Sequence, residues 1–248
     1  MERVRSMSDV VHLGNQTDSA IAGGVHPSDR IRFAFVEGIV VILDFATQNY
    51  FALNERGSTI WRSILDGADE PLDRDTRAFI DDCRQRGFLV DGTQSPSGTP
   101  SVRSASTSLL ARAGLWTPLA IICLYRAASL LRVRGFAHVY AFHDAFGHRL
   151  PVTRRASQVD ESLRAFYRAE SVIPMPGAPE DCLPRSLALY AYLRSVGFPC
   201  THLIGIRRYP SLTMHAWVEV DGRVVADSAA SREFVVLARI GIGGAAAG

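Results

Sequence analysis

The sequence contains no lysine, few cysteines and no long apolar run, and these shortages limit what the protein can be. All 27 basic residues are arginine and the net charge is only +2, so general nucleic-acid binding is not expected. The longest apolar stretch, AGLWTPLAIICLY at 113–125, has 13 residues. Because this length is too short to cross a bilayer, we expect a buried helix there and no membrane partner. The N-terminus lacks the apolar core of a signal peptide.

The cysteines and histidines lack the spacings that mark metal sites. No CxxC pair occurs, which argues against both a zinc framework and a disulfide scaffold and makes a reducing cytoplasm the simplest setting. No HExxH motif occurs either, and no glycine-rich phosphate loop. We therefore expect no metal and no cofactor. The residues considered were Cys83, Cys123, Cys182, Cys200, His138, His143 and His148.

Composition divides the chain into two folded parts. Hydrophobic residues make up 47% and charged residues 21%, as in a soluble globular protein. The stretch DGTQSPSGTPSVRSASTS at 91–108 is small and polar, so it cannot bury enough apolar surface to fold and is predicted to be a linker. The predicted parts are a flexible tail at 1–30, a domain at 31–92, a linker at 93–108, a larger domain at 109–240 and a flexible tail at 241–248.

The first domain is predicted to be a small α+β unit. Runs of β-forming residues at 31–35, 39–45 and 50–53 are separated by turn signals, which indicates three antiparallel strands. Asn54 is placed to cap a following helix, and Asp73 begins a second helix that stops at Gly87. We see no catalytic constellation in this part.

The stretch GIVVILDFATQNYFALNERGSTIWRSILDG resembles the PqqD-like peptide-binding domains, also called RiPP recognition elements. These resemble winged helix-turn-helix modules and bind the leader of a precursor peptide as an added strand. The resemblance implies that the leader pairs along Tyr50, Phe51, Ala52 and Leu53. The family has a short middle helix, for which DGADEPLDRD leaves little room.

In the larger domain, PEDCLPRSLALY places Cys182 where a loop becomes a helix. Asp181 can cap this helix, and Pro184 is tolerated in its first turn. The positive helix end favours a thiolate, whereas many cysteines simply pack as small apolar side chains. Placement alone leaves structural burial and nucleophile equally open.

The stretch MHAWVEVDGRVVADS at 214–228 is predicted to form two strands around a turn. A two-residue loop would send Asp227 to the face opposite His215. A three-residue loop, with Gly222 left-handed, sets His215 against Asp227 and Glu219 against Arg223. It also pairs Trp217 with Val225, and these matched pairs favour the three-residue register.

A cysteine at a helix start, followed by a histidine facing an aspartate, is the general pattern of a cysteine hydrolase. The order resembles the transglutaminase-like, papain-like fold, and CLPRSLALYAYLRSVGFPCTHLIGIRR with HAWVEVDGRVVADS resembles the lasso peptide biosynthesis B proteins. The resemblance implies Cys182 as nucleophile, His215 as general base and acid, and Asp227 as orienting carboxylate.

The resemblance further implies a fused protein, with a recognition element and a leader peptidase in one cytoplasmic chain. Its partners would be a precursor peptide and a separate asparagine-synthetase-like cyclase that closes the macrolactam. Trp217 is a candidate substrate contact. The alternatives are a transglutaminase-like acyl transferase, a non-catalytic precursor chaperone and, least favoured, a winged-helix DNA binder. We expect His202 to be a strand residue; Arg185 and Ser186 either line the cleft or are ordinary surface.

Overall fold

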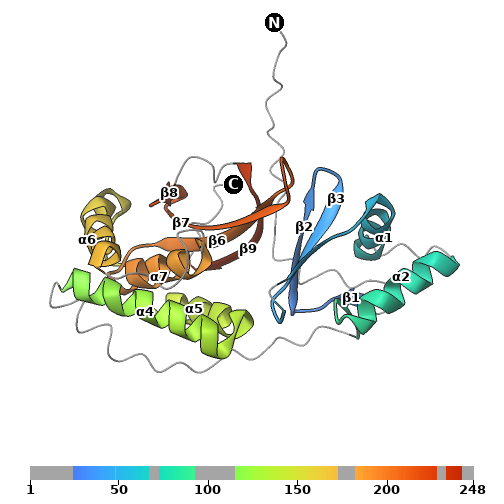
Figure 1. Cartoon of the computed structure of the whole chain (residues 1–248), viewed down its shortest axis with the longest axis horizontal. Coiled ribbons are helices and arrows are strands. Elements are labelled where there is room, and N and C mark those ends of the chain that lie inside the picture. Colours follow the sequence, from blue (N-terminus) through green and yellow to red (C-terminus); the bar gives the residue numbers. More distant parts are fainter. Residues whose placement is uncertain are drawn as a thin grey trace, which may run out of the picture. The chain divides into compact units, whose positions relative to one another are not determined.

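The computed structural model describes residues 25–47, 49–66, 73–92, 115–172, 182–227 and 233–241 (Figure 1). The chain divides into two compact units, Met1–Ser28 with Thr59–Pro96 and Asp29–Ser58 with Ser97–Gly248. The predicted linker at 93–108 lies outside the described residues, as do most of both predicted tails. The predicted domain boundaries therefore stay predictions.

The first unit contains a two-stranded antiparallel sheet and helix α2. Strand β1 (Val25–Pro27) pairs with β5 (Leu89–Asp91). Residues 25–27 were predicted to belong to a flexible tail, but they form a strand instead. This strand was not predicted because it has only three residues, one of them a proline, and shows no alternation of apolar and polar residues. Helix α2 (Arg74–Gln85) begins as predicted, with the Asp73 carboxylate accepting from the Thr76 N–H at 2.6 Å.

The predicted three-stranded antiparallel sheet is present. Strands β2 (Ile31–Val36), β3 (Ile39–Asp44) and β4 (Tyr50–Ala52) are adjacent in that order. Glu37 and Gly38 form the first turn with φ of 49° and 85°, the left-handed pair that suits a two-residue hairpin. Asn54 caps α1 (Glu55–Leu65) by accepting from the Gly57 N–H at 2.8 Å.

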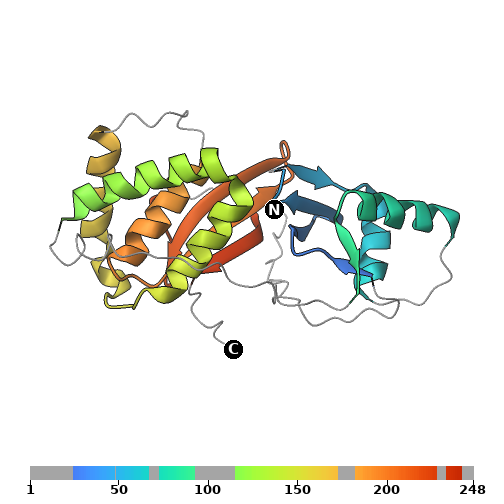
Figure 2. The ribbon, with the colours of Figure 1, turned by 90° about the horizontal axis from the view of Figure 1, so that it is seen from below.

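The second unit also contains a four-stranded antiparallel sheet in the order β8-β7-β6-β9. Helix α7 packs on β6 and β7, and α4 packs on α7; together with α5 they lie on one side of this sheet (Figures 1 and 2). The elements are α4 (Trp116–Arg134), α5 (Phe136–Arg149), a 3₁₀ turn (Ala156–Gln158), α6 (Val159–Val172), α7 (Cys182–Ser195), β6 (Cys200–Arg207), β7 (Thr213–Val220), β8 (Arg223–Val225) and β9 (Val235–Gly241).

Helix α4 is longer than the predicted 113–125 segment because it continues past Arg126 to Arg134. It has 19 residues and a mean hydropathy of 1.2 over its most apolar window, so by length and composition alone it is long enough to cross a membrane. Core helices of soluble proteins meet the same criteria, and 28% of this window is buried in the described structure. Leu119 and Leu124 are among the fully buried residues.

The register predicted for the 214–228 hairpin is wrong. Val220 pairs with Arg223, and Glu219 with Val224, so the loop has two residues. Asp221 (φ 48°) and Gly222 (φ 73°) are both left-handed, as in a type I′ turn. An Asp-Gly pair is well suited to this turn, and its local preference outweighed the cross-strand charge pairing on which the prediction relied.

Replacing Gly222 by valine should therefore destabilise the protein by about 1–2 kcal/mol, because a β-branched residue resists positive φ. No atom lies within 4 Å of a Cβ built at Gly222, so the cost comes from the backbone and not from a clash. Gly222→Asn should be mild, because asparagine tolerates this region. Urea denaturation of both variants measures the difference, and equal stability of the two would contradict the turn assignment.

Candidate active site

Cys182 is the first residue of α7, as the sequence predicted. It is half-buried, whereas the other three cysteines, Cys83, Cys123 and Cys200, are buried. First-turn N–H groups of a helix have no partner within that helix, so the Cys182 N–H is available to a developing oxyanion. The predicted capping residue, Asp181, lies outside the described residues.

His215 lies on β7, and its Nε2 is 2.6 Å from Asp227 Oδ2. The two side chains are 25% and 17% exposed, so solvent screens this pair only in part. Nδ1 is then the ring nitrogen left to hydrogen-bond the Cys182 side chain, the contact that raises the His215 pKa most. The structure thus brings together the three residues that the sequence analysis put forward as catalytic.

Asp227 reaches His215 in spite of the register. Val225 pairs with Val218 on the core side of the sheet, so simple alternation would put Ala226 on the His215 side and Asp227 on the core side. Strand β8 ends at Val225, and Ala226 has φ of 59°. Ala226 packs against the core instead, and this left-handed residue turns Asp227 back toward His215.

The proton equilibrium of His215 is shifted toward the imidazolium. The hydrogen bond with Cys182 raises the His215 pKa most; burial opposes it, and the hydrogen bond and charge of Asp227 raise it further, to about 9. His215 is therefore protonated at neutral pH, and an imidazolium beside a cysteine can stabilise a negative charge on its sulfur. The arrangement therefore suits a cysteine nucleophile with a histidine proton carrier.

Replacing Cys182 by alanine should lower the His215 pKa below about 9, because the largest cause of the upward shift is lost. In this variant Asp227 still raises the His215 pKa and burial still lowers it. In the native protein, the contribution of His215 to the free energy of unfolding is complete below about pH 6.5 and is lost as the pH rises through about 9. NMR titration of the His215 ring measures the shift, and an unchanged pKa would contradict the Cys182 contact.

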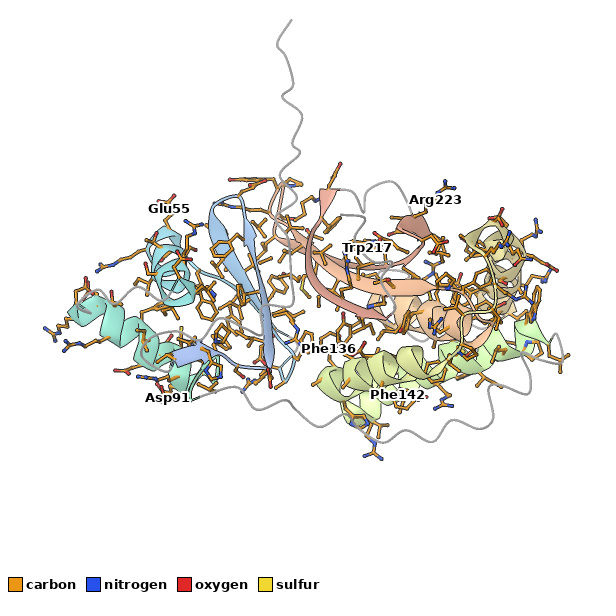
Figure 3. The ribbon with its side chains drawn as sticks, turned by 180° about the vertical axis from the view of Figure 1, so that it is seen from behind. Glu55, Asp91, Phe136, Phe142, Trp217 and Arg223 are labelled. Atoms are coloured by element: carbon orange, nitrogen blue, oxygen red, sulfur yellow. The ribbon has the colours of Figure 1, made fainter. Side chains whose placement is uncertain are left out.

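Two aromatic rings pack beside His215. The Trp217 ring is stacked at 6.1 Å between centroids, and Phe234 lies at 5.3 Å. Trp217, which is labelled in Figure 3, is 4% exposed, and its Nε1 donates to Glu219 at 3.1 Å. Its ring is therefore held in place beside the histidine. Its predicted substrate contact stays a prediction. Glu219 faces Val224, so the predicted Glu219–Arg223 pairing is wrong.

Sequence reasoning missed Phe234 and Gly205. Gly205 lies opposite His215 in the β6–β7 pairing, and a Cβ there would meet the Trp217 ring at 2.7 Å and Phe234 Cβ at 2.9 Å. A glycine inside a strand pattern is a usable signal for such a close approach. Phe234 precedes β9 without any such signal.

The buried histidines His202 and His143 do not join the site. His202 is in strand β6, as predicted, and is fully buried with its Nε2 2.9 Å from Ser186 Oγ. Burial lowers the pKa of His202 to about 3 and that of His143 to about 4, so both are neutral. Within the described ranges, no group of three or more histidine, cysteine or acidic side chains is placed to hold a metal ion.

The residues predicted to bind a leader peptide lie on and beside β4. Among the described strands β4 has only β3 as a neighbour. The Leu53 N–H donates to Val40 O at 2.8 Å. Because inward and outward groups alternate along an antiparallel strand, Phe51 also bonds inward, while the N–H groups of Tyr50 and Ala52 face the outer edge. The Phe51 N–H therefore does not face the open edge of β4.

Comparison with known proteins adds one finding. Residues 130–239 match the family model described as the transglutaminase-like superfamily, and Cys182, His215 and Asp227 all fall within the match. No curated protein and no solved structure matches the chain. The superfamily is compatible with a cysteine peptidase or an acyl transferase.

Proposed function

We propose that the transglutaminase-like domain at residues 130–239 is a cysteine endopeptidase that removes the leader from a ribosomally made precursor peptide, as in lasso peptide biosynthesis. The observation that supports hydrolytic chemistry is the linked set of Cys182, His215 and Asp227, with the 2.6 Å contact between the last two. The leader substrate is inferred from the sequence resemblance of both parts of the chain.

In the proposed reaction the Cys182 thiolate attacks the carbonyl carbon of the scissile amide, and the Cys182 N–H stabilises the oxyanion. His215 donates its proton to the leaving nitrogen, the C–N bond breaks and a thioester remains. Neutral His215 then removes a proton from water, which attacks the thioester. The C–S bond then breaks, the leader leaves as a carboxylic acid, and the Cys182 thiolate and protonated His215 are restored.

The proposed role of β4 is to pair with the leader as an additional strand. The outward N–H and C=O groups of Tyr50 and Ala52 offer one side of a ladder to an extended peptide. In this proposal the protein is cytoplasmic, and a separate asparagine-synthetase-like cyclase acts on the product amine that hydrolysis exposes.

The reaction is tested with the full-length protein and a precursor peptide encoded beside its gene, in the presence of excess glycine ethyl ester. Mass spectrometry should find the leader with a new carboxylate and the core with a free amine. Leader carrying the glycine ester as an amide would instead assign the acyl-transfer alternative. Intact precursor that nevertheless binds would favour a chaperone.

Replacing Ala52 by proline should weaken leader binding about tenfold, because it removes an outward N–H without removing a β3–β4 hydrogen bond. Serine at the same position is the matched control and should bind normally, since it keeps that N–H. Fluorescence anisotropy of a labelled leader measures both. Equal affinity of the two variants would contradict strand pairing at β4.

A further inference from the structure

Ala226 is in a backbone conformation that alanine rarely adopts. Its φ of 59° lies in the left-handed region, which is unfavourable for a residue with a Cβ and persists only where the surroundings impose it. This residue decides whether Asp227 faces His215, as the β7–β8 register shows. A contact that stabilises the turn at Ala226 therefore acts directly on the geometry of the candidate active site.

Arg185 makes that contact. Its Nη1 donates to the Ala226 carbonyl oxygen at 3.0 Å. Its other donors are held by Glu170 on α6, with Nε 2.6 Å from Oε1 and Nη2 3.1 Å from Oε2. Such a two-bond pair fixes the plane of the guanidinium and leaves one edge for the carbonyl. The Arg185 and Glu170 side chains are only 36% and 21% exposed.

Arg185 is also one turn beyond Cys182 on α7. The helix that begins with the nucleophile thus bears the side chain that holds the turn before Asp227. This arrangement answers the open question from the sequence: Arg185 is neither ordinary surface nor simply a lining of the cleft.

We propose that Arg185, oriented by Glu170, is a positioning residue that holds Ala226 left-handed and so keeps Asp227 against His215. The proposal deepens the proposed function, because it assigns a further residue to the same site, but it depends only on the Cys182–His215–Asp227 geometry. Lysine cannot replace Arg185, because a single ammonium cannot make the two-bond pair with Glu170 and also reach the Ala226 carbonyl in a fixed plane.

The test uses iodoacetamide alkylation of Cys182 in the full-length protein, measured by mass spectrometry between pH 5 and 10. This measurement needs no peptide substrate, so a wrong leader assignment does not affect it. The other cysteines are buried, so the reagent should modify Cys182 selectively. Arg185→Lys should lower the alkylation rate at pH 7 about tenfold, because a displaced Asp227 stabilises the imidazolium less. The NMR-measured His215 pKa should fall in the same variant. Arg164→Lys, on the exposed side of α6, is the control and should leave both unchanged.

A second substitution separates positioning from other roles. Glycine enters the left-handed region without the Cβ cost, so Ala226→Gly in the Arg185→Lys background should recover about fivefold in alkylation rate. A merely destabilised protein would lose melting temperature but keep the pH profile of its folded fraction. If Arg185→Lys does not fold, Glu170→Gln replaces it and should show the same shifts. An unchanged His215 pKa in the folded variant, or no recovery with Ala226→Gly, would overturn the proposal.

Discussion

Replacing Cys182 by alanine should reduce kcat for precursor cleavage by at least about 10³-fold, because no other nucleophile reaches the substrate carbonyl in the proposed mechanism. Leader affinity should stay within about tenfold, or ~1.4 kcal/mol, because the proposed leader contacts are outward backbone groups of β4, which this substitution leaves unchanged. Rapid-quench kinetics and leader anisotropy on one protein sample measure the two quantities. The pair of results distinguishes loss of chemistry from loss of folding.

Cys182→Ser is the matched control for the loss of volume in Cys182→Ala. It keeps an atom in the position of the sulfur but replaces the thiol with a far weaker nucleophile, so it should also be inactive. Full cleavage activity in Cys182→Ala would remove this residue as nucleophile and, with it, the proposed peptidase. A rapid serine variant would mean that thiolate formation does not limit the reaction.

Replacing Asp227 by asparagine should lower kcat by about 10²-fold, less than His215→Ala, which should match the cysteine variant. An orienting residue is usually less essential than the base that it orients. The substitution also removes the carboxylate charge that helps to raise the His215 pKa. The high-pH limb of the activity profile, which reports protonated His215 in this mechanism, should therefore move to lower pH.

Asp221→Asn is the matched control because it makes the same chemical change in the same hairpin at an exposed, left-handed position that asparagine tolerates. It should leave kcat and the pH profile unchanged. If Asp227→Asn retained the native high-pH limb, the 2.6 Å contact would have no part in setting the charge of His215.

The conformational preferences of short sequence segments were enough to predict much of the architecture. The turn at Glu37–Gly38, the caps at Asn54 and Asp73 and the start of a helix at Cys182 each depend on a few adjacent residues. For that reason the three-stranded sheet and the placement of Cys182 at a helix start could be predicted. His215 and Asp227 have the side chains of a general base and an orienting carboxylate, and a turn signal lies between them. These features were enough to propose them as a pair from the sequence.

The sequence by itself determined which residues meet, but only the tertiary structure decided how Asp227 does so. The prediction required a three-residue loop, whereas the local preference of Asp221–Gly222 for a two-residue turn gives the opposite alternation. The left-handed Ala226 reverses that outcome, and Arg185 and Glu170, from two different helices, contact it. A strained backbone angle stabilised by residues distant in sequence has no local signature, because its cost is offset only once α6, α7 and β8 have packed together.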